Sequence, residues 1–171
     1  MKYLRRGIWY LVTRLLVICL VAGLLITIFY YAYNVANIRV ILKDGMATRA
    51  KYILGMSNES KSLDKYFQDP SDLTYERSVY ADYSIRGLDH RIDMDFVWVW
   101  PWETKATVTV RESVPRIDGR VKGSRASEVT NKNGAEAIYP PEWEEKTYQV
   151  ELEKKAGQWK ITKLTPVSRR K

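Results

Sequence analysis

The sequence predicts an α+β protein in which an N-terminal transmembrane helix precedes a domain built around a curved antiparallel sheet. The chain opens with an uncharged apolar run, Leu15–Tyr33. Apolar side chains then recur at helical spacing as far as Leu54. In the second half of the chain, apolar and polar residues alternate in four segments, as they do in strands with one buried face. Helices grouped ahead of strands are typical of α+β domains.

The apolar run is long enough to cross a membrane as a helix. It holds 19 residues, and at about 1.5 Å per residue it just spans the hydrocarbon core. The predicted anchor residues are Leu15, Leu16, Val17, Leu20, Leu24, Leu25, Ile28 and Phe29. A cleaved secretory signal is the alternative, but its apolar core is about 7–15 residues long and ends in an A-x-A-like site. Neither Ala32 nor Ala36 completes such a site, so the sequence favours a retained anchor.

Basic residues before the run predict its orientation. Lys2, Arg5, Arg6 and Arg14 lie on its amino-terminal side, and no acidic residue precedes it. Because positively charged flanks stay in the cytoplasm, we expect residues 1–14 there and the chain beyond Tyr33 on the far side. The predicted location is the cytoplasmic membrane, crossed once.

The exported part has the size and charge of one domain that folds by packing alone. Residues 34–171 suffice for one hydrophobic core but not comfortably for two. The only cysteine, Cys19, lies in the predicted span, so no disulfide is expected outside. The formal charge is +8, and removing the four basic residues of the flank leaves +4, scattered except for a basic tail at 167–171. Nucleic acid is therefore not an expected partner.

The first part of this domain is predicted to be helical. Its apolar stripe is Val35, Ile38, Leu42, Met46 and Ile53, and the opposite, polar face is assigned Lys43, Asp44, Arg49 and Lys51. This helix, within residues 34–55, is either continuous with the anchor or gently broken at Gly45, and Gly55 is placed to stop it. A short second helix is expected over Ser60–Gln68, while Asp72–Ala81 fits a helix or a strand equally well.

The rest of the domain, which covers residues 56–166, is predicted to be mainly sheet. In the first strand the expected core side is Ile92, Met94, Phe96, Trp98 and Trp100, and the other side is Asp93, Asp95, Val97 and Val99. After a turn at Pro101–Thr104, the antiparallel partner presents Ala106, Val108 and Val110. A long polar loop over 119–141 follows. The last hairpin pairs Tyr148, Val150 and Leu152 with Trp159 and Ile161 across an Ala156-Gly157 turn.

The terminal hairpin resembles that of the nuclear transport factor 2-like superfamily. Lys146–Leu152 (KTYQVEL) and Gly157–Leu164 (GQWKITKL) are similar to the hairpin that closes those cone-shaped domains, with the pattern aromatic-x-V-x-L, turn, G-x-W-K-I. The resemblance covers roughly Asn34–Leu164 and implies a helix-plus-sheet cone. The chain departs from the family in its long loop at 119–141 and in the segment before the first strand. Similar single-pass proteins occur in type IV secretion and conjugation machines, so the resemblance implies a membrane-anchored bacterial envelope protein.

The sequence offers no dependable catalytic or cofactor-binding motif. His90 is the only histidine, and without an exported cysteine it cannot build a Cys/His zinc site. Paired with Asp89 or Asp93 it would serve as a general base, but its charged neighbours favour a surface position. Asp93 and Asp95 would share a proton or bind a cation in a cavity, yet the alternation directs them to water. We therefore expect no catalytic residue, cofactor or metal, and a protein that is not an enzyme.

Exposed aromatic residues are the more informative set. Trp100 and Trp102 flank the predicted turn, where full burial is not expected, and exposed indoles suit a protein interface or the outer membrane leaflet. The sequence thus predicts a non-enzymatic scaffold whose extracytoplasmic domain binds other envelope proteins or further copies of itself. The alternative is a small-ligand-binding or isomerase-like cone, whose cavity would need inward polar groups.

Overall fold

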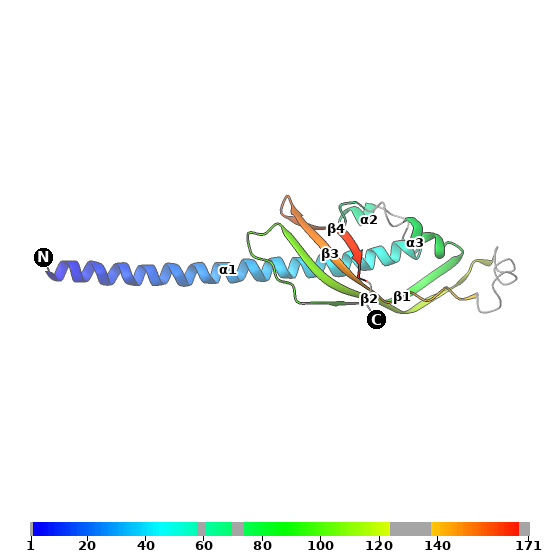
Figure 1. Ribbon diagram of the computed structural model, residues 1–171, viewed down its shortest axis with the longest axis horizontal. Coiled ribbons are helices and arrows are strands. Elements are labelled where there is room, and N and C mark those ends of the chain that lie inside the picture. The colour runs from blue at the N-terminus through cyan, green and yellow to red at the C-terminus, as the bar shows by residue number, and fades with distance from the viewer. Residues whose placement is uncertain (1, 58–60, 70–73, 124–137, 168–171) are drawn as a thin grey trace.

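The structure is α+β, with helices ahead of an antiparallel sheet. The computed structural model describes residues 2–57, 61–69, 74–123 and 138–167, without the side chains of 2–6 and 74–76. The elements are α1 (Lys2–Ile53), α2 (Lys61–Asp64), α3 (Thr74–Val79), β1 (Tyr83–Met94), β2 (Lys105–Val121), β3 (Lys146–Lys155) and β4 (Gln158–Pro166). The strands lie in the order β1-β2-β3-β4, each antiparallel to its neighbour, and the sheet curves around the C-terminal half of α1 (Figure 1). The predicted fold class is confirmed at this level.

Helix α1 runs unbroken through both the predicted anchor and the first helix of the domain. It has 52 residues, and its N-terminal half projects from the domain as a bare rod (Figure 1). The predicted anchor side chains are each 52–67% exposed, and the helix is long and apolar enough to cross a membrane. Of the residues that predict its orientation, Arg14 lies over the Tyr10 ring. The side chains of Lys2, Arg5 and Arg6 lie outside the described set.

The C-terminal half of α1 forms the centre of the core. The middle of the predicted stripe, namely Ile38, Leu42 and Met46, has no exposed surface. Gly45 does not break the helix. A Cβ atom there would lie 3.1 Å from both Ile161 Cδ1 and Tyr66 Cβ, so glycine allows β4 and the chain after α2 to pack closely on α1.

Gly55 ends α1 as predicted. Its φ of +70° lies in the left-handed region that glycine adopts without strain. The Gly55 amide donates to the Tyr52 carbonyl, and the Met56 amide donates to the Lys51 carbonyl. This pair of hydrogen bonds is the Schellman motif, which satisfies carbonyls that the helix end would otherwise leave without a partner.

The two short helices cover one edge and one end of the sheet. The predicted helix over Ser60–Gln68 is shorter than expected, because α2 ends at Asp64. Phe67 then forms an isolated parallel bridge with Ile161 of β4, and Leu63 and Phe67 are both buried. Within Asp72–Ala81, which fits either a helix or a strand by its sequence, the described part contains the helix α3.

The sheet buries one face against α1. The inward side chains of β2, β3 and β4 include Val108, Val110, Tyr148, Val150, Leu152, Trp159 and Ile161, all at most 5% exposed. Ala156 and Gly157 both have positive φ, at 49° and 81°, as a two-residue type I′ hairpin turn requires. Thr162 is an extra residue in β4, because Glu151 pairs with Lys163 while Leu152 pairs with Ile161. Such bulges bend a strand and help the sheet to curve.

The predicted facing of the first strand is wrong beyond Met94. Val97 and Val99 are 1% and 0% exposed, whereas Phe96 and Trp98 are 72% and 56% exposed, which reverses the expected sides. The alternation changes phase by one residue at Asp95, where the chain leaves β1. The smaller valine side chains then join the core around α1, and the large aromatic rings stay outside.

The predicted loop at 119–141 begins inside a strand, because β2 reaches Val121. Residues 124–137 of this loop, like 168–171 of the basic tail, lie outside the described residues. Beyond the end of α1, β1 and β2 continue as a two-stranded arm (Figure 1). The base of this arm holds a second apolar cluster of Ile53, Leu54, Tyr80, Ile85, Leu88, Ile117 and Trp143.

Replacing Trp159 tests how much the core depends on this hairpin. Trp159 is 2% exposed, so Trp159→Ala should lower the free energy of unfolding by about 3–5 kcal/mol. Urea titration of the full-length protein in detergent micelles, followed by circular dichroism, measures the change. The matched control is Trp102→Ala, at a side chain that is 71% exposed, which should change stability by less than about 0.5 kcal/mol. Equal effects of the two substitutions would contradict the burial of Trp159.

Candidate functional site

A buried ionic cluster of Arg49, His90 and Glu112 joins α1 to β1 and β2. Glu112 is fully buried. Arg49 donates from Nη1 to Glu112 Oε2 at 3.1 Å, and His90 Nε2 lies 3.0 Å from Glu112 Oε1. The side chains of Arg49 and His90 are only 3% and 9% exposed. Because a buried charge is costly unless it is paired, the two oxygens of Glu112 make the burial of these groups tolerable.

The cluster corrects two predictions. The sequence places Arg49 on the polar face of its helix, and it places His90 at the surface. In the structure Arg49 is buried, and His90 is half-buried with a side chain that is only 9% exposed. Arg49 follows Met46 by three residues and precedes Ile53 by four, so it lies on the apolar stripe despite its charge. His90 lies two residues before Ile92, on the same inward face of β1.

Sequence reasoning missed Glu112 altogether, although a signal was present. Val108 and Val110 alternate inward along β2, and Glu112 is the next residue in that alternation. Arg49, His90 and Glu112 each occupy an inward position on a different element. Because buried charged groups need partners, these positions are a reason to expect that the three side chains meet. The sequence alone does not reveal which elements are neighbours, and so the contact itself is a structural finding.

The geometry of the cluster favours a structural ion pair over acid–base chemistry. A cavity of about 530 Å³ opens beside it, with Arg49, Lys146, Tyr148 and Lys163 among its walls. The Arg49 guanidinium lies 5.5 Å from the centre of the Tyr148 ring. Among the described residues that line this cavity, Glu112 and His90 do not occur. A general base must come within hydrogen-bond distance of its substrate, and neither group lines this cavity.

The acidic residues of β1 and of the segment that follows it lie at the surface. Asp93 and Asp95 are exposed, as predicted. Arg91 donates from Nε and Nη2 to the Asp89 carboxylate at 3.3 and 2.7 Å, and this hydrogen bonding holds the pKa of Asp89 below its usual value. Both partners are exposed, so the pair contributes little stability. Within the described ranges, no three His, Cys, Asp or Glu side chains gather closely enough to hold a metal ion.

A second feature, here called the aromatic ladder, consists of Phe96, Trp98, Trp100 and Trp102. Successive ring centres lie 6.1, 5.2 and 5.2 Å apart. Trp98 and Trp100 meet edge to face, and Trp100 and Trp102 stack in parallel. Trp100 and Trp102, the predicted interaction residues, are 41% and 71% exposed. The ladder is therefore a continuous aromatic surface that faces away from the core.

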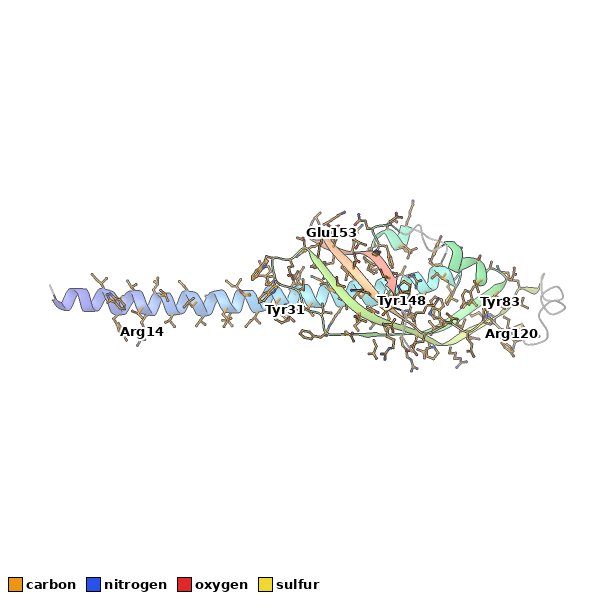
Figure 2. All side chains as sticks on the ribbon, in the orientation of Figure 1. Arg14, Tyr31, Tyr83, Arg120, Tyr148 and Glu153 are labelled. Carbon is orange, nitrogen blue, oxygen red and sulfur yellow. The ribbon has the colours of Figure 1, made fainter. Side chains whose placement is uncertain are left out.

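The ladder is fixed to α1 where that helix enters the domain, at Tyr31 (Figure 2). The Tyr31 ring lies 5.4 Å from the Trp98 ring, and its hydroxyl donates to the Val97 carbonyl at 3.3 Å. One turn later, the Asn34 amide donates to the Pro101 carbonyl at 3.3 Å. Lys154 Nζ donates to Asn34 Oδ1 at 3.0 Å, which ties the β3–β4 hairpin to the same point.

Removing the central carboxylate tests the role of the ionic cluster. Glu112→Gln leaves the Arg49 guanidinium in the core without this counter-charge, so the free energy of unfolding should fall by about 3–5 kcal/mol. The matched control is Glu151→Gln on the exposed face of β3, where we expect less than about 0.5 kcal/mol. Urea titration of the full-length protein in micelles compares the two. A Glu112→Gln protein as stable as the control would show that the cluster has no structural role.

Comparison of the chain with protein-family models, with curated proteins and with solved structures finds no match in any of the three. The function is therefore inferred from the two features above. They lie 18 residues apart along α1, from Tyr31 to Arg49, which is about 27 Å of helix. The ionic cluster is turned into the core, and the aromatic ladder is turned outward.

Proposed function

We propose that the protein is a non-enzymatic, single-pass membrane protein whose extracytoplasmic domain mediates protein–protein assembly in an envelope complex of the secretion or conjugation type. Residues 15–33 of α1 cross the cytoplasmic membrane, residues 1–14 stay in the cytoplasm, and the domain lies outside. The exposed apolar rod and the basic flank before it support this orientation. The partners are other envelope proteins or further copies of this chain.

The observation that carries the proposal is the continuity of α1. The helix passes from its exposed apolar half into the core without a break, and Ile38, Leu42 and Met46 fix it there. A flexible linker would let the domain move freely around its anchor, whereas a continuous helix sets its height and direction. A subunit that meets its neighbours in a defined geometry needs that fixed placement. An enzyme acting on a freely diffusing substrate gains nothing from it.

The proposal includes a cone of the nuclear transport factor 2-like kind. Its support is the order of the elements, with helices ahead of a curved antiparallel sheet. The closing hairpin adds to this support, because Leu152 pairs with Ile161 and Trp159 is buried between the hairpin and the core. In this domain α1 itself fills the hollow of the sheet, so the interior that would hold a ligand is largely occupied by protein side chains.

A second candidate function is the binding of a small ligand in the cavity beside Arg49. Its volume of about 530 Å³ falls within the range of known ligand pockets, roughly 300–1,000 Å³. Lys146 and Lys163 line it together with Arg49, and Asp69 is the acidic residue among its walls. This arrangement would suit a small anion, since Lys146 and Lys163 line the cavity beside Arg49, although Glu112 already balances the charge of Arg49.

The orientation is tested with a reporter fused after Lys171. Alkaline phosphatase, which folds only outside the cytoplasm, should be active, and intact-mass measurement should show that residues 1–33 are retained. A reporter that works only in the cytoplasm would overturn the proposed orientation. A mature protein that lacks its first thirty or so residues would overturn the retained anchor.

Assembly is tested by site-specific photo-crosslinking in cells. A photoreactive residue placed at Thr107, Gln149 or Glu151, all on the exposed face of the sheet, should give discrete adducts with an envelope protein or a second copy. The buried position Val150 is the matched control and should give none. Asp93→Asn and Asp95→Asn should leave the adducts unchanged. If every exposed position is silent, and a small anion raises the melting temperature of the wild type but not of Lys163→Ala, ligand binding replaces assembly.

A further inference from the structure

The aromatic ladder leaves a large apolar surface uncovered. Its members are between 41% and 72% exposed, and each ring touches the next. Single exposed aromatic residues are ordinary on protein surfaces, but contiguous exposed apolar patches mark contact with another molecule. The question is which molecule lies against the ladder.

The position of the ladder identifies its neighbour. Trp98 packs on Tyr31, which lies two residues before the end of the apolar run Leu15–Tyr33. The neighbouring Tyr30 and Tyr33 of α1 are 53% and 56% exposed. The hydrogen bonds from Tyr31 and Asn34 hold the ladder segment at this level of the helix. The ladder therefore continues the exposed apolar surface of α1 at the height where a membrane-spanning segment leaves the hydrocarbon core.

We propose that the aromatic ladder is a membrane-binding surface that lies in the lipid headgroup zone of the leaflet through which α1 leaves the bilayer. This inference rests on the membrane crossing in the proposed function. Tryptophan and tyrosine prefer that zone because an apolar ring with one polar N–H or O–H suits a boundary between hydrocarbon and water. Trp98, Trp100 and Trp102 supply such rings, and Phe96 supplies a wholly apolar one.

The charged residues around the ladder do not explain membrane binding by attraction to anionic headgroups. Lys154 is engaged with Asn34, and Lys155 lies 3.3 Å from Glu153. Glu103 accepts a hydrogen bond from the Trp100 amide at 2.7 Å. Basic and acidic groups thus occur together at this end of the domain. Binding by the rings, rather than by attraction to anionic headgroups, should persist at high salt, because only the electrostatic contribution is screened.

A second contact with the membrane, through the ladder, limits how the domain can rotate. A single helix leaves the domain free to rotate about the axis of its span. Contact of the ladder with the same leaflet stops that rotation, because the ladder lies beside α1, against Tyr31, and not on the helix axis. The polar outer face of the sheet then holds one orientation relative to the membrane plane.

Environment-sensitive labels on cysteine test the inference in the full-length protein, with one copy in each nanodisc of phosphatidylcholine and phosphatidylglycerol. The native Cys19, which is exposed on α1, reports on the span. In a Cys19→Ser background, Trp102→Cys carries the label in the ladder and leaves the other three rings in place. Gln149→Cys, on the exposed face of β3, carries the label as the matched control.

We expect lipids with a quencher near the headgroup to remove most of the fluorescence of the label at 102, and aqueous iodide to remove little, at low and high salt alike. The label at 149 should show the reverse. If iodide quenches both labels equally, the ladder does not bind the membrane. Shielding of the 102 label from both quenchers also overturns the inference, because protein then covers the ladder. A Cys19 label that no lipid quencher reaches would instead overturn the membrane crossing itself.

Discussion

One unbroken helix serves as both the exposed apolar rod and the centre of the domain core, and this continuity constrains the rest of the domain. The sheet must curve around a cylinder about 10 Å across, which the bulge at Thr162 and the irregular pairing of β1 with β2 accommodate. Gly45 removes the side chain that would keep β4 from the helix. The Schellman motif at Gly55 then ends α1 sharply, so that β1 and β2 extend beyond the helix as a two-stranded arm.

The ionic cluster lies at the boundary between the two apolar clusters. This holds on each of the three elements that supply its residues, namely α1, β1 and β2. On α1, Arg49 separates Met46 of the main cluster from Ile53 of the distal one. His90 and Glu112 occupy the corresponding boundaries on β1 and β2. A buried ion pair adds little net stability over apolar side chains of similar size. The cluster also depends on register. Arg49 meets Glu112 only when β2 is aligned with the helix, because a slip of one residue would turn Glu112 to the outer face and leave the charge of Arg49 in the core.

Sequence periodicity predicted the parts of this fold in which the residues at inward positions are apolar and those at outward positions are polar. The stripe from Ile38 to Met46 and the hairpin with Trp159 needed nothing beyond spacing. Arg49 and His90 were misplaced because their charge was given more weight than their position on the stripe and the strand. The aromatic residues were misplaced for a different reason. Alternation is informative only while a strand continues, and nothing in the order of residues marks the change of phase at Asp95, which depends on contacts with α1 some sixty residues earlier.

If lipid covers the ladder, the surface left for protein partners lies elsewhere, and the geometry narrows it to two regions. The outer face of the sheet is polar and exposed along β2 and β3, and it suits a hydrated interface that can form and separate. The arm of β1 and β2, marked by Tyr83 and Arg120, lies at the end of the domain opposite the N-terminus of α1 (Figure 2). A rigid helix and a lateral contact with the leaflet would together hold this arm at a fixed distance from the membrane. The arm would then contact a partner that lies away from the bilayer. The outer face of the sheet would contact a neighbour in the same membrane.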